Sequence, residues 1–403
     1  MNSEQAVFIV GAARTPVAKI NGSLSSFTAT DLGAAAIKAA VSRSGIPADL
    51  VDHVYMGQAL QAGAGQSPAK RAAILSGLSE TADATTVNKV CASGLKAVCL
   101  AAQEIMLGHG ATVVAGGMES MSNVPLYKAK NRGPGGTKPA EDDSFSDGLH
   151  DGLVNPYDGL FMGSCADQIA GRHDISRNSQ DKYAATAYRK ACAAQKRGLH
   201  DHEITSIVSS SSSQPEDVVA DTIRDKAVFQ KLSSLPLAFS DTGTITAGNS
   251  STLADGAAAV VLANHTVAKK YCEKTEILAR IISFADASEK PIDFAVAPSK
   301  AIRLALQRAK LATDQISLWE INEAFAVVVL VNQEILKLDK SKVNVNGGAI
   351  ATGHPLGSSG CRILVSLVHQ LEPGQYGVAA ICNGGGGATA MVVRRLDVGC
   401  FES

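Results

Sequence analysis

Two stretches of this chain, one beginning near residue 91 and one near residue 354, share the same layout. Each starts at a reactive side chain, continues as an apolar segment of helical period and ends in a β-branched strand followed by glycines. Cys91 precedes the first helical segment, and its strand covers residues 112–115. His354 precedes the second, where residues 361–371 are helical and 377–382 form the strand. This repetition predicts an internal duplication whose halves direct helix N-termini and strand ends to one shared site.

The rest of the chain indicates an α/β fold. Short β-branched runs alternate with Ala-rich segments of helical period, at residues 7–10, 32–44, 51–56 and 69–75. Such alternation is typical of a mixed or parallel sheet covered by helices. From about residue 123 to 251 the rhythm breaks into polar, Gly-rich and Ser-rich sequence that still contains an amphipathic helix at 180–197. We therefore expect a loop-rich insertion between two α/β blocks and not a linker.

Composition excludes several classes of protein. The 403 residues carry a formal net charge of −1, so the chain lacks the basic footprint that nucleic-acid binding needs. Its eight cysteines are scattered without a CxxC pair, which argues against a disulfide framework or a zinc ribbon and favours reduced thiols. We expect no apolar run to approach the roughly 20 residues that span a bilayer, and the start lacks a secretory signal. We expect a soluble protein with no membrane or nucleic-acid partner.

Cys91 is the first candidate for chemistry. It lies in Val90-Cys91-Ala92-Ser93-Gly94, directly before an amphipathic helix. The positive end of a helix dipole stabilises a thiolate, and the thiolate is the nucleophilic form. The alternative is a small buried hydrophobic residue, as Cys99 on the inner stripe of the same helix is expected to be.

His354 and Cys382 are the second and third candidates. Gly353 and Pro355 make a tight turn that would hold the His354 ring in one orientation, although a surface turn histidine is the simpler alternative.

Cys382 precedes a run of four glycines, whose backbone N–H groups can stabilise an oxyanion or cradle a phosphate. The run formally matches GxGxxA, but a strand-like segment follows where a dinucleotide site needs a helix. We favour oxyanion stabilisation.

Polar residues elsewhere give weaker signals. Asn322 interrupts an apolar run, where a polar side chain needs a partner, but structural hydrogen bonding explains it equally well. Arg224, Lys226 and Lys231 in the insertion form either a solvated face or a site for ligand phosphates.

Taken together, five motifs in order along nearly the whole chain resemble the thiolases. They are Val90-Cys91-Ala92-Ser93-Gly94, Gly116-Gly117-Met118-Glu119-Ser120-Met121-Ser122, Asn322-Glu323-Ala324-Phe325, Gly347-Gly348-Ala349-Ile350-Ala351-Thr352-Gly353-His354-Pro355 and Cys382-Asn383-Gly384-Gly385-Gly386. Residues 162–165 and 284–287 look most similar to the short-chain acetyl-CoA acetyltransferases of the mitochondrial, potassium-responsive type.

This resemblance implies a five-layered αβαβα fold of two similar halves plus a loop domain that binds coenzyme A. The N-terminal half would comprise residues 1–121 and 252–276, the loop domain 122–251 and the C-terminal half 277–403. It further implies a homotetramer built from tight dimers, acyl-CoA substrates, no cofactor beyond the coenzyme A of the substrate, and a possible K⁺. A mitochondrial location is favoured, with a cytoplasmic one as the alternative.

The resemblance also implies residue roles. Cys91 would be the acylated nucleophile, His354 the base that activates it, and Cys382 the group that moves the proton to and from the α-carbon or the leaving thiolate. Asn322, through a water, would form one oxyanion site with His354, and the backbone N–H groups of Cys91 and Gly384 a second. Coenzyme A would contact Leu153, Met162, Tyr188, Arg224, Lys226, Lys231, Phe239, Ala247, Ser251, Ala324 and Phe325. A potassium site would use Tyr188, Ala247, Gly248, Ser250 and Ile350. Phe161 departs from the family, which often carries His there.

The implied reaction is the reversible Claisen condensation of two acetyl-CoA to acetoacetyl-CoA, by ping-pong transfer through Cys91. A broader 3-ketoacyl-CoA thiolase and a β-ketoacyl synthase acting on carrier-protein thioesters are alternatives within the same fold. A metal or redox protein built on Cys91, His354 and Cys382 is a non-enzymatic alternative, although the spacing offers no chelating pair.

Overall fold

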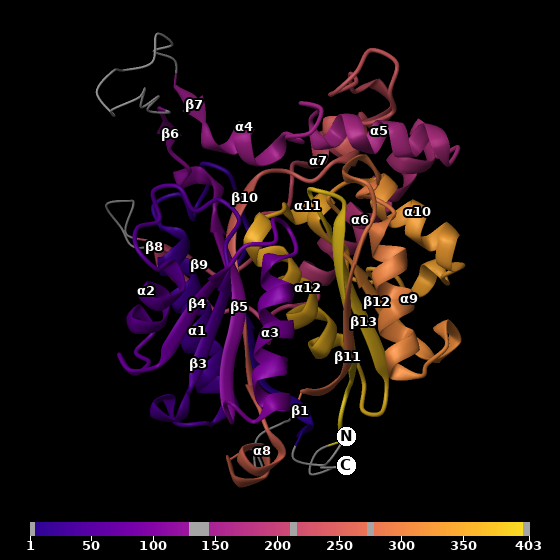
Figure 1. The fold of residues 1–403 in the computed structure, drawn as a ribbon. Helices are drawn as coiled ribbons and strands as arrows, with labels where there is room; N and C mark the ends of the chain where they lie inside the picture. Colours follow the sequence, from indigo (N-terminus) through magenta and orange to yellow (C-terminus); the bar gives the residue numbers. More distant parts are fainter. Residues whose placement is uncertain (1–4, 129–144, 210–215, 272–277, 398–403) are drawn as a thin grey trace, which may run out of the picture.

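One twisted sheet runs through the whole molecule. The computed structural model describes residues 5–128, 145–209, 216–271 and 278–397 (Figure 1). The N-terminal half contributes strands in the order β4-β3-β5-β10-β1, which are Asp83–Val87, His53–Gly57, Thr112–Ser120, Ala254–Ala263 and Val7–Arg14. The C-terminal half contributes β11-β14-β13-β12, which are Ala279–Ser288, Gly387–Arg394, Tyr376–Asn383 and Ile316–Ile321. The halves join where β1 pairs antiparallel with β11. A short strand β2 (Ala18–Lys19) adds to β10.

The predicted duplication is confirmed by the strand pairing. In each half the first strand pairs antiparallel with the last, the last pairs antiparallel with the strand before it in the sequence, and that strand lies parallel to the second. Both first strands also carry a register shift at matching places, between Ile9 and Gly11 in β1 and between Ile281 and Ser283 in β11. The counterpart of β4 is reduced to a single parallel bridge between Trp319 and Val343.

Helices and sheet form the five layers that were predicted. The helices α1 (Ala29–Ser44) and α2 (Pro68–Leu75) share a buried apolar cluster with one face of the first half's strands. A central cluster joins α3 (Ser93–Leu107) and α12 (Leu356–Gln370) to strands of both halves. On the far side, α9 (Ala297–Ala309) and α10 (Ala326–Leu336) pack on the second half. Figure 1 shows α3 and α12 between the two sets of strands.

The central layer is crowded, and this explains glycines whose role the sequence alone left open. A Cβ atom on Gly94 of α3 would lie 2.7 Å from the Gly357 carbonyl oxygen of α12, and one on Gly117 would lie 2.0 Å from it. Two predictions in this region were wrong because close packing places glycines inside elements and not at their ends. Gly116 and Gly117 lie inside β5 and do not end it. The helix α12 begins at Leu356, five residues before the predicted start, and includes Gly357 and Gly360.

One segment, Val90–Leu107, is long and apolar enough to cross a membrane by length and composition, contrary to the expectation that no run approaches this length. It contains α3, which packs against β5, β3 and α12 in the central layer. Its apolar character is therefore explained by burial between the two sets of strands.

The insertion carries its own elements, several of them at the end of the sheet drawn at the top of Figure 1, although the pair Ile207–Ser209 and Glu216–Val218 lies beside α1 and α2. These are the hairpins β6–β7 (Leu126–Tyr127, Ser146–Asp147) and β8–β9 (Ile207–Ser209, Glu216–Val218) and the helices α4 (Gly148–Leu153), α5 (Met162–Arg172), α6 (Arg177–Lys196) and α7 (Lys226–Gln230). The helix α6 confirms the one predicted at 180–197. The Gly-rich run at 130–136, the acidic run at 141–143 and most of the serine run lie outside the described residues. The three domain boundaries stay a prediction. Two further helices, α8 (His265–Tyr271) and α11 (Ala349–Thr352), lie outside the insertion.

Candidate active site

One apolar pocket lies where the two halves and the insertion meet. Its walls include Cys91, His354, Cys382 and Gly384 from the two halves. From the insertion and the neighbouring loops come Leu153, Phe161, Met162, Gly163, Phe239, Ser250, Ser251, Thr252, Leu253, Phe294, Ala324, Phe325, Leu356 and Asn383. The structure thus brings together three of the side chains that the sequence singled out for chemistry.

Cys91 sits in a constrained turn two residues before α3. Val90, directly before it, has a φ of 50°, a left-handed conformation that is costly for a β-branched residue. The turn is closed by the Ser93 hydroxyl, which donates to the Val90 carbonyl at 2.5 Å and accepts from the Lys89 N–H at 2.8 Å. Backbone strain of this kind persists only where the surrounding contacts hold the conformation. These contacts therefore also fix the position of the Cys91 thiol.

The electrostatics of Cys91 differ from the expectation based on the helix dipole. Burial raises the pKa of the Cys91 thiol to about 12, and the nearby Glu119 carboxylate acts in the same direction. Hydrogen bonds from the backbone of Gly384 and of Cys91 itself lower it only in part. The resting side chain is therefore a neutral thiol, because burial outweighs the end of the helix. A base has to take its proton as the reaction begins.

His354 occupies the matching place in the second half, two residues before α12. Its Nδ1 lies 2.5 Å from the Ser359 hydroxyl, and its Nε2 lies 3.4 Å from Nδ2 of Asn322. Its backbone N–H donates to the Thr252 carbonyl at 2.9 Å. Burial, assisted by the charge of Arg362, lowers the pKa of His354 to about 3. The ring is therefore neutral in the resting state and can accept a proton at one nitrogen.

Asn322 and Cys382 come from the ends of neighbouring parallel strands. Asn322 follows β12 directly and is fully buried, and its Oδ1 has no hydrogen-bond partner. Cys382 lies near the end of β13 and is 1% exposed. Burial and the proximity of Cys91 raise the pKa of the Cys382 thiol above its usual range. An unpartnered buried amide oxygen is costly unless a ligand or water completes it, so this corner is built to hold a polar group.

The glycine run forms a tight turn between β13 and β14. Gly385 and Gly386 have φ values of 83° and 84°, which only glycine adopts readily. Asn383 donates from Nδ2 to the Gly384 carbonyl at 2.7 Å, which ties its side chain into the turn beside Cys91. The run leads into strand β14 and not into the helix that a dinucleotide site needs, as the sequence predicts.

The candidate coenzyme A residues divide into two groups. Six of them line the pocket: Leu153, Met162, Phe239, Ser251, Ala324 and Phe325. The remaining five do not. Lys226 and Lys231 are exposed at the ends of α7, and the ring of Tyr188 stacks on Phe229 with centroids 4.1 Å apart. Arg224 donates from Nη1 to the carbonyl of Ser250, a residue of the pocket wall, at 3.0 Å. Ala247 begins a short 3₁₀ turn that ends at Asn249.

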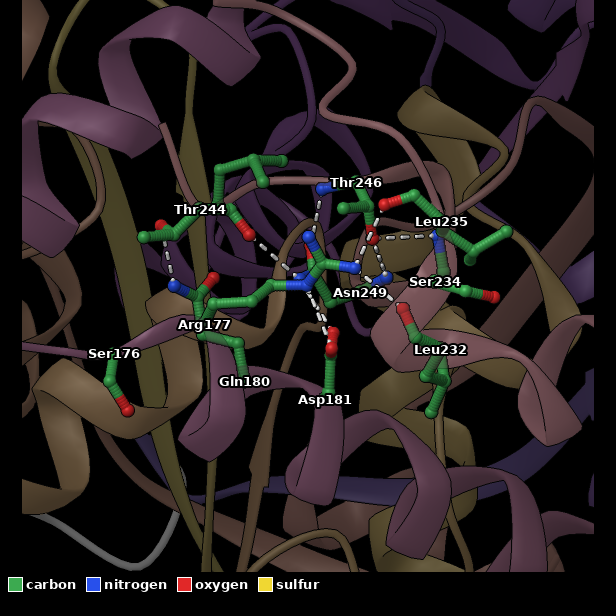
Figure 2. A network of polar contacts seen from close by, with 12 residues as sticks. Ser176, Arg177, Gln180, Asp181, Leu232, Ser234, Leu235, Thr244, Thr246 and Asn249 are labelled. Atoms are coloured by element: carbon green, nitrogen blue, oxygen red, sulfur yellow. Dashed lines mark hydrogen bonds and ion pairs between the residues drawn. The ribbon is translucent and has the colours of Figure 1, made fainter. Parts of the chain in front are cut away.

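A buried network holds that turn against α6 (Figure 2). Asn249 donates from Nδ2 to Asp181 at 3.0 Å, and Arg177 donates from Nε to the same carboxylate at 2.7 Å. Arg177 also reaches the carbonyls of Leu232 and Leu235, at 2.5 and 3.1 Å. The network fixes the segment that carries Ser250 and Ser251 into the pocket wall.

Of the five predicted potassium positions, Ala247 and Gly248 lie in the same turn and Ser250 follows it, whereas Tyr188 lies on α6 and Ile350 on α11. The Ser250 carbonyl already accepts from the Arg224 guanidinium, and the backbone N–H of Ile350 donates to the Glu323 carboxylate at 3.1 Å. A fixed cation beside one of the intended ligands repels a second cation. The Arg224 contact therefore disfavours a potassium ion at Ser250, the site as a whole stays a prediction, and no catalytic step below depends on it.

Two residues were missed by sequence reasoning. Ser359 contacts His354 from one turn along α12, a spacing of five residues that local inspection could have found. Glu119 was quoted only as part of a motif. Its fully buried carboxylate accepts from the backbone N–H groups of Ala59, Leu60 and Gly357 at 2.9, 3.2 and 2.8 Å. Those contacts join segments remote in sequence, so no local pattern indicates them.

Within the described ranges the cysteines are free thiols, namely Cys91, Cys99, Cys165, Cys192, Cys361 and Cys382. Cys99 is buried, as expected. The same part of the chain holds no group of three or more His, Cys, Asp or Glu side chains arranged to bind a metal.

Comparison with known proteins agrees with this geometry. The family described as "Thiolase, N-terminal domain" matches residues 7–266, and "Thiolase, C-terminal domain" matches residues 275–395. The chain is 50% identical to the mitochondrial acetyl-CoA acetyltransferase erg10A of Aspergillus fumigatus, covering 98% of this chain and 91% of that protein. It is also 50% identical to the acetyl-CoA acetyltransferase of Yarrowia lipolytica, covering 97% of each.

Solved structures give the same result. The Acat5 thiolase from Ascaris suum, in complex with coenzyme A, superposes with a TM-score of 0.91 at 40% identity, covering 97% of this chain and all of that one. The human mitochondrial 3-ketoacyl-CoA thiolase has a TM-score of 0.91 at 36% identity, covering 97% and 99% of the two chains. With both family domains matched in order over the duplicated fold, this chain belongs to the thiolase family.

Proposed function

We propose that this protein is an acetyl-CoA C-acetyltransferase, which condenses two acetyl-CoA to acetoacetyl-CoA and coenzyme A and catalyses the reverse thiolysis. The observation that carries the proposal is the convergence of Cys91, His354 and Cys382 in one pocket beside the Gly384 turn. The names of the relatives at about half identity support the short-chain substrate.

The first half-reaction transfers an acetyl group to Cys91. The Cys91 thiol gives its proton to Nε2 of His354 while its sulfur attacks the thioester carbonyl. The resulting oxyanion lies against the backbone N–H groups of Cys91 and Gly384, which already point at the sulfur. Collapse breaks the bond to the coenzyme A sulfur, and that thiolate takes the proton of Cys382. Acetyl-Cys91, protonated His354 and the Cys382 thiolate remain.

The second half-reaction forms the carbon–carbon bond. The Cys382 thiolate removes an α-proton from a second acetyl-CoA, and the enolate oxygen is stabilised by Nε2–H of His354 and by a water held at Asn322. The enolate carbon attacks acetyl-Cys91. The Cys91 thiolate then leaves and recovers its proton from His354, so every group returns to its starting state.

The experiment compares Cys91→Ala and Cys382→Ala with the wild-type protein. Incubation with acetyl-CoA should add one acetyl group to wild-type Cys91 and none to Cys91→Ala, measured by mass spectrometry. Cys382→Ala should still acquire the acetyl group but should not produce acetoacetyl-CoA. Retention of thiolysis near the wild-type rate by Cys91→Ala would exclude the mechanism.

The alternatives are separated by substrate range. Thiolysis should be fastest for the four-carbon 3-ketoacyl-CoA; a clear preference for long chains would indicate a broad 3-ketoacyl-CoA thiolase. Preference for a carrier-protein thioester over coenzyme A would indicate a β-ketoacyl synthase. Acceptance of 2-methylacetoacetyl-CoA belongs in the same series.

Assembly and location are part of this proposal. We expect a homotetramer, which sedimentation or light scattering would distinguish from a dimer. The mitochondrial names of several relatives support a mitochondrial protein.

A further inference from the structure

The imidazole of His354 is held at both nitrogens by groups of fixed polarity. The Ser359 hydroxyl lies 2.5 Å from Nδ1 and donates its one proton to the Pro355 carbonyl at 2.9 Å. Toward Nδ1 it can therefore only accept. At the other nitrogen, the Asn322 amide presents its Nδ2 group to Nε2, and an amide nitrogen only donates. Both contacts require the ring proton on Nδ1 and a lone pair on Nε2.

We propose that Ser359 is a positioning residue that keeps the proton of neutral His354 on Nδ1, so that Nε2 is the nitrogen that accepts and returns the proton of Cys91. The proposal rests on the acyl-transfer function above for its kinetic consequences, but the tautomer itself does not depend on that function. Without the Ser359 acceptor, the two neutral tautomers of the ring differ little in energy, and the Nε2–H form cannot act as the base.

Burial makes this arrangement matter. Ser359 is 1% exposed and His354 is 5% exposed, so water does not replace a lost contact at Nδ1. When His354 carries the proton of Cys91, its Nδ1–H bond to the hydroxyl becomes a bond from a charged donor and strengthens. Ser359 thus also stabilises the imidazolium that exists between the two half-reactions, as an orienting partner does for other catalytic histidines.

The same helix offers a matched control. Ser358 is also 1% exposed, but its hydroxyl has no hydrogen-bond partner. Replacing Ser358 by Ala removes a buried hydroxyl of the same size one position away from the contact. Any general cost of removing a serine at the start of α12 should therefore appear in both alanine variants.

Steady-state thiolysis of acetoacetyl-CoA provides the kinetic test. In Ser359→Ala, kcat should fall about 10- to 100-fold, as expected for losing a hydrogen bond to a charged group. The KM should stay near the wild-type value, and acetylation of Cys91 should slow in parallel. Ser358→Ala should behave like the wild type. Ser359→Thr keeps the hydroxyl and should recover part of kcat, which separates loss of the contact from poor folding.

A second measurement addresses the tautomer directly. Nitrogen-15 NMR of histidine-labelled protein, with the His354 signals assigned by their loss in His354→Asn, should show the Nδ1–H form in the wild type and a mixture in Ser359→Ala. An Nε2–H tautomer in the wild type, or equal kinetic losses in the two alanine variants, would overturn the proposal. If the wild type did not turn over acyl-CoA, the proposed function would fail, whereas the NMR result would still decide the role of Ser359.

Discussion

The carboxylate of Glu119 accepts a hydrogen bond of 2.8 Å from the backbone N–H of Gly357, which joins β5 of the first half to the first turn of α12 in the second. The same carboxylate acts on Cys91 and raises the pKa of its thiol. One buried acid thus links β5, the strand after the helix that begins beside Cys91, to α12, the helix that begins beside His354.

Replacing Glu119 by Gln should change how stability depends on pH. Burial raises the pKa of Glu119 to about 7 even though three backbone N–H groups lower it. Between its unfolded value of about 4.3 and 7, the native state holds more protons than the unfolded state, so this group makes stability fall as pH rises through that window. Gln cannot titrate. The wild type should lose free energy of unfolding relative to Glu119→Gln between pH 5 and pH 8, measured by urea denaturation. A difference independent of pH would contradict this assignment.

The same variant should make Cys91 more reactive. Above pH 7 the wild-type carboxylate is ionised, and its charge disfavours the Cys91 thiolate. Iodoacetamide should therefore alkylate Cys91 faster in Glu119→Gln than in the wild type at pH 8, with a smaller difference at pH 6. Mass spectrometry of the Cys91 peptide reports the rate. Slower alkylation in the variant would show that the carboxylate acts mainly by shaping the loop.

Arg14 should be needed for stability because it is buried with two acids of the insertion. It contacts Glu203 at 2.8 Å and Asp221 at 2.6 Å, and its side chain is 2% exposed. Arg14→Met would remove the guanidinium from two buried carboxylates and leave Glu203 with His200 and Asp221 with the backbone N–H of Val17. We expect a loss of about 3–5 kcal/mol in the free energy of unfolding at pH 7.

The loss should shrink in acid. Burial alone would raise the pKa of both carboxyls, but Arg14 lowers each below its usual value. Their contribution is therefore present above the unfolded pKa of about 4 and disappears as pH falls toward the native values. Arg43→Met is the control, because that guanidinium donates to the carbonyls of Ala12, Glu203 and Ile204 and acts on the Glu203 carboxylate only through its charge, so its effect should depend less on pH. An equal pH dependence in both variants would argue against the ion pairs as the cause.

Asn322→Ala should separate the two half-reactions. In the proposed mechanism a water at Asn322 stabilises the enolate of the second step, so condensation should fall about 10²- to 10³-fold, the usual cost of losing one oxyanion donor. Exchange of labelled coenzyme A into acetyl-CoA, which reports only the first step, should fall much less. Asn332→Ala serves as the control, since Asn332 is equally buried but donates to Ala295 and Val328 away from the pocket. Equal losses in both steps would place Asn322 in the support of His354 alone.

Potassium should have little effect on this protein. The Arg224 guanidinium already donates to the Ser250 carbonyl, one of the positions that the resemblance proposed as ligands. Exchanging KCl for NaCl at equal ionic strength should leave kcat/KM unchanged. In Arg224→Gln, which removes the fixed charge, kcat/KM should be higher in potassium than in sodium. A strong potassium requirement in the wild type would show that Arg224 moves away during turnover.

The sequence predicted the parts of this protein that depend on local periodicity and on side-chain type. The duplication, the helices beside Cys91 and His354 and the convergence of Cys91, His354 and Cys382 all followed from motifs and their order. Helix α6 was found from its apolar spacing within three residues of its ends.

What local sequence could not predict depends on distant contacts. The strand β5 contains a glycine at position 117 because the Gly357 carbonyl, 240 positions along the chain, leaves no room for a side chain there. Cys91 has a raised pKa because tertiary burial outweighs the helix end that the motif suggested. Arg224 donates to the carbonyl of Ser250, a residue of the pocket wall, without lining the pocket itself. No spacing within the insertion indicates which way a long side chain turns.

The placement of Cys91 and His354 has an evolutionary consequence. Each stands two residues before the helix that its half contributes to the central layer. In an ancestral pair of identical halves, both positions would have carried the same amino acid, so a nucleophile could not have faced a base. Two copies that differ in sequence, as the two halves of this chain do, can carry a thiol at one position and an imidazole at the other. The asymmetry of the chemistry therefore requires halves that are alike in fold and different in sequence.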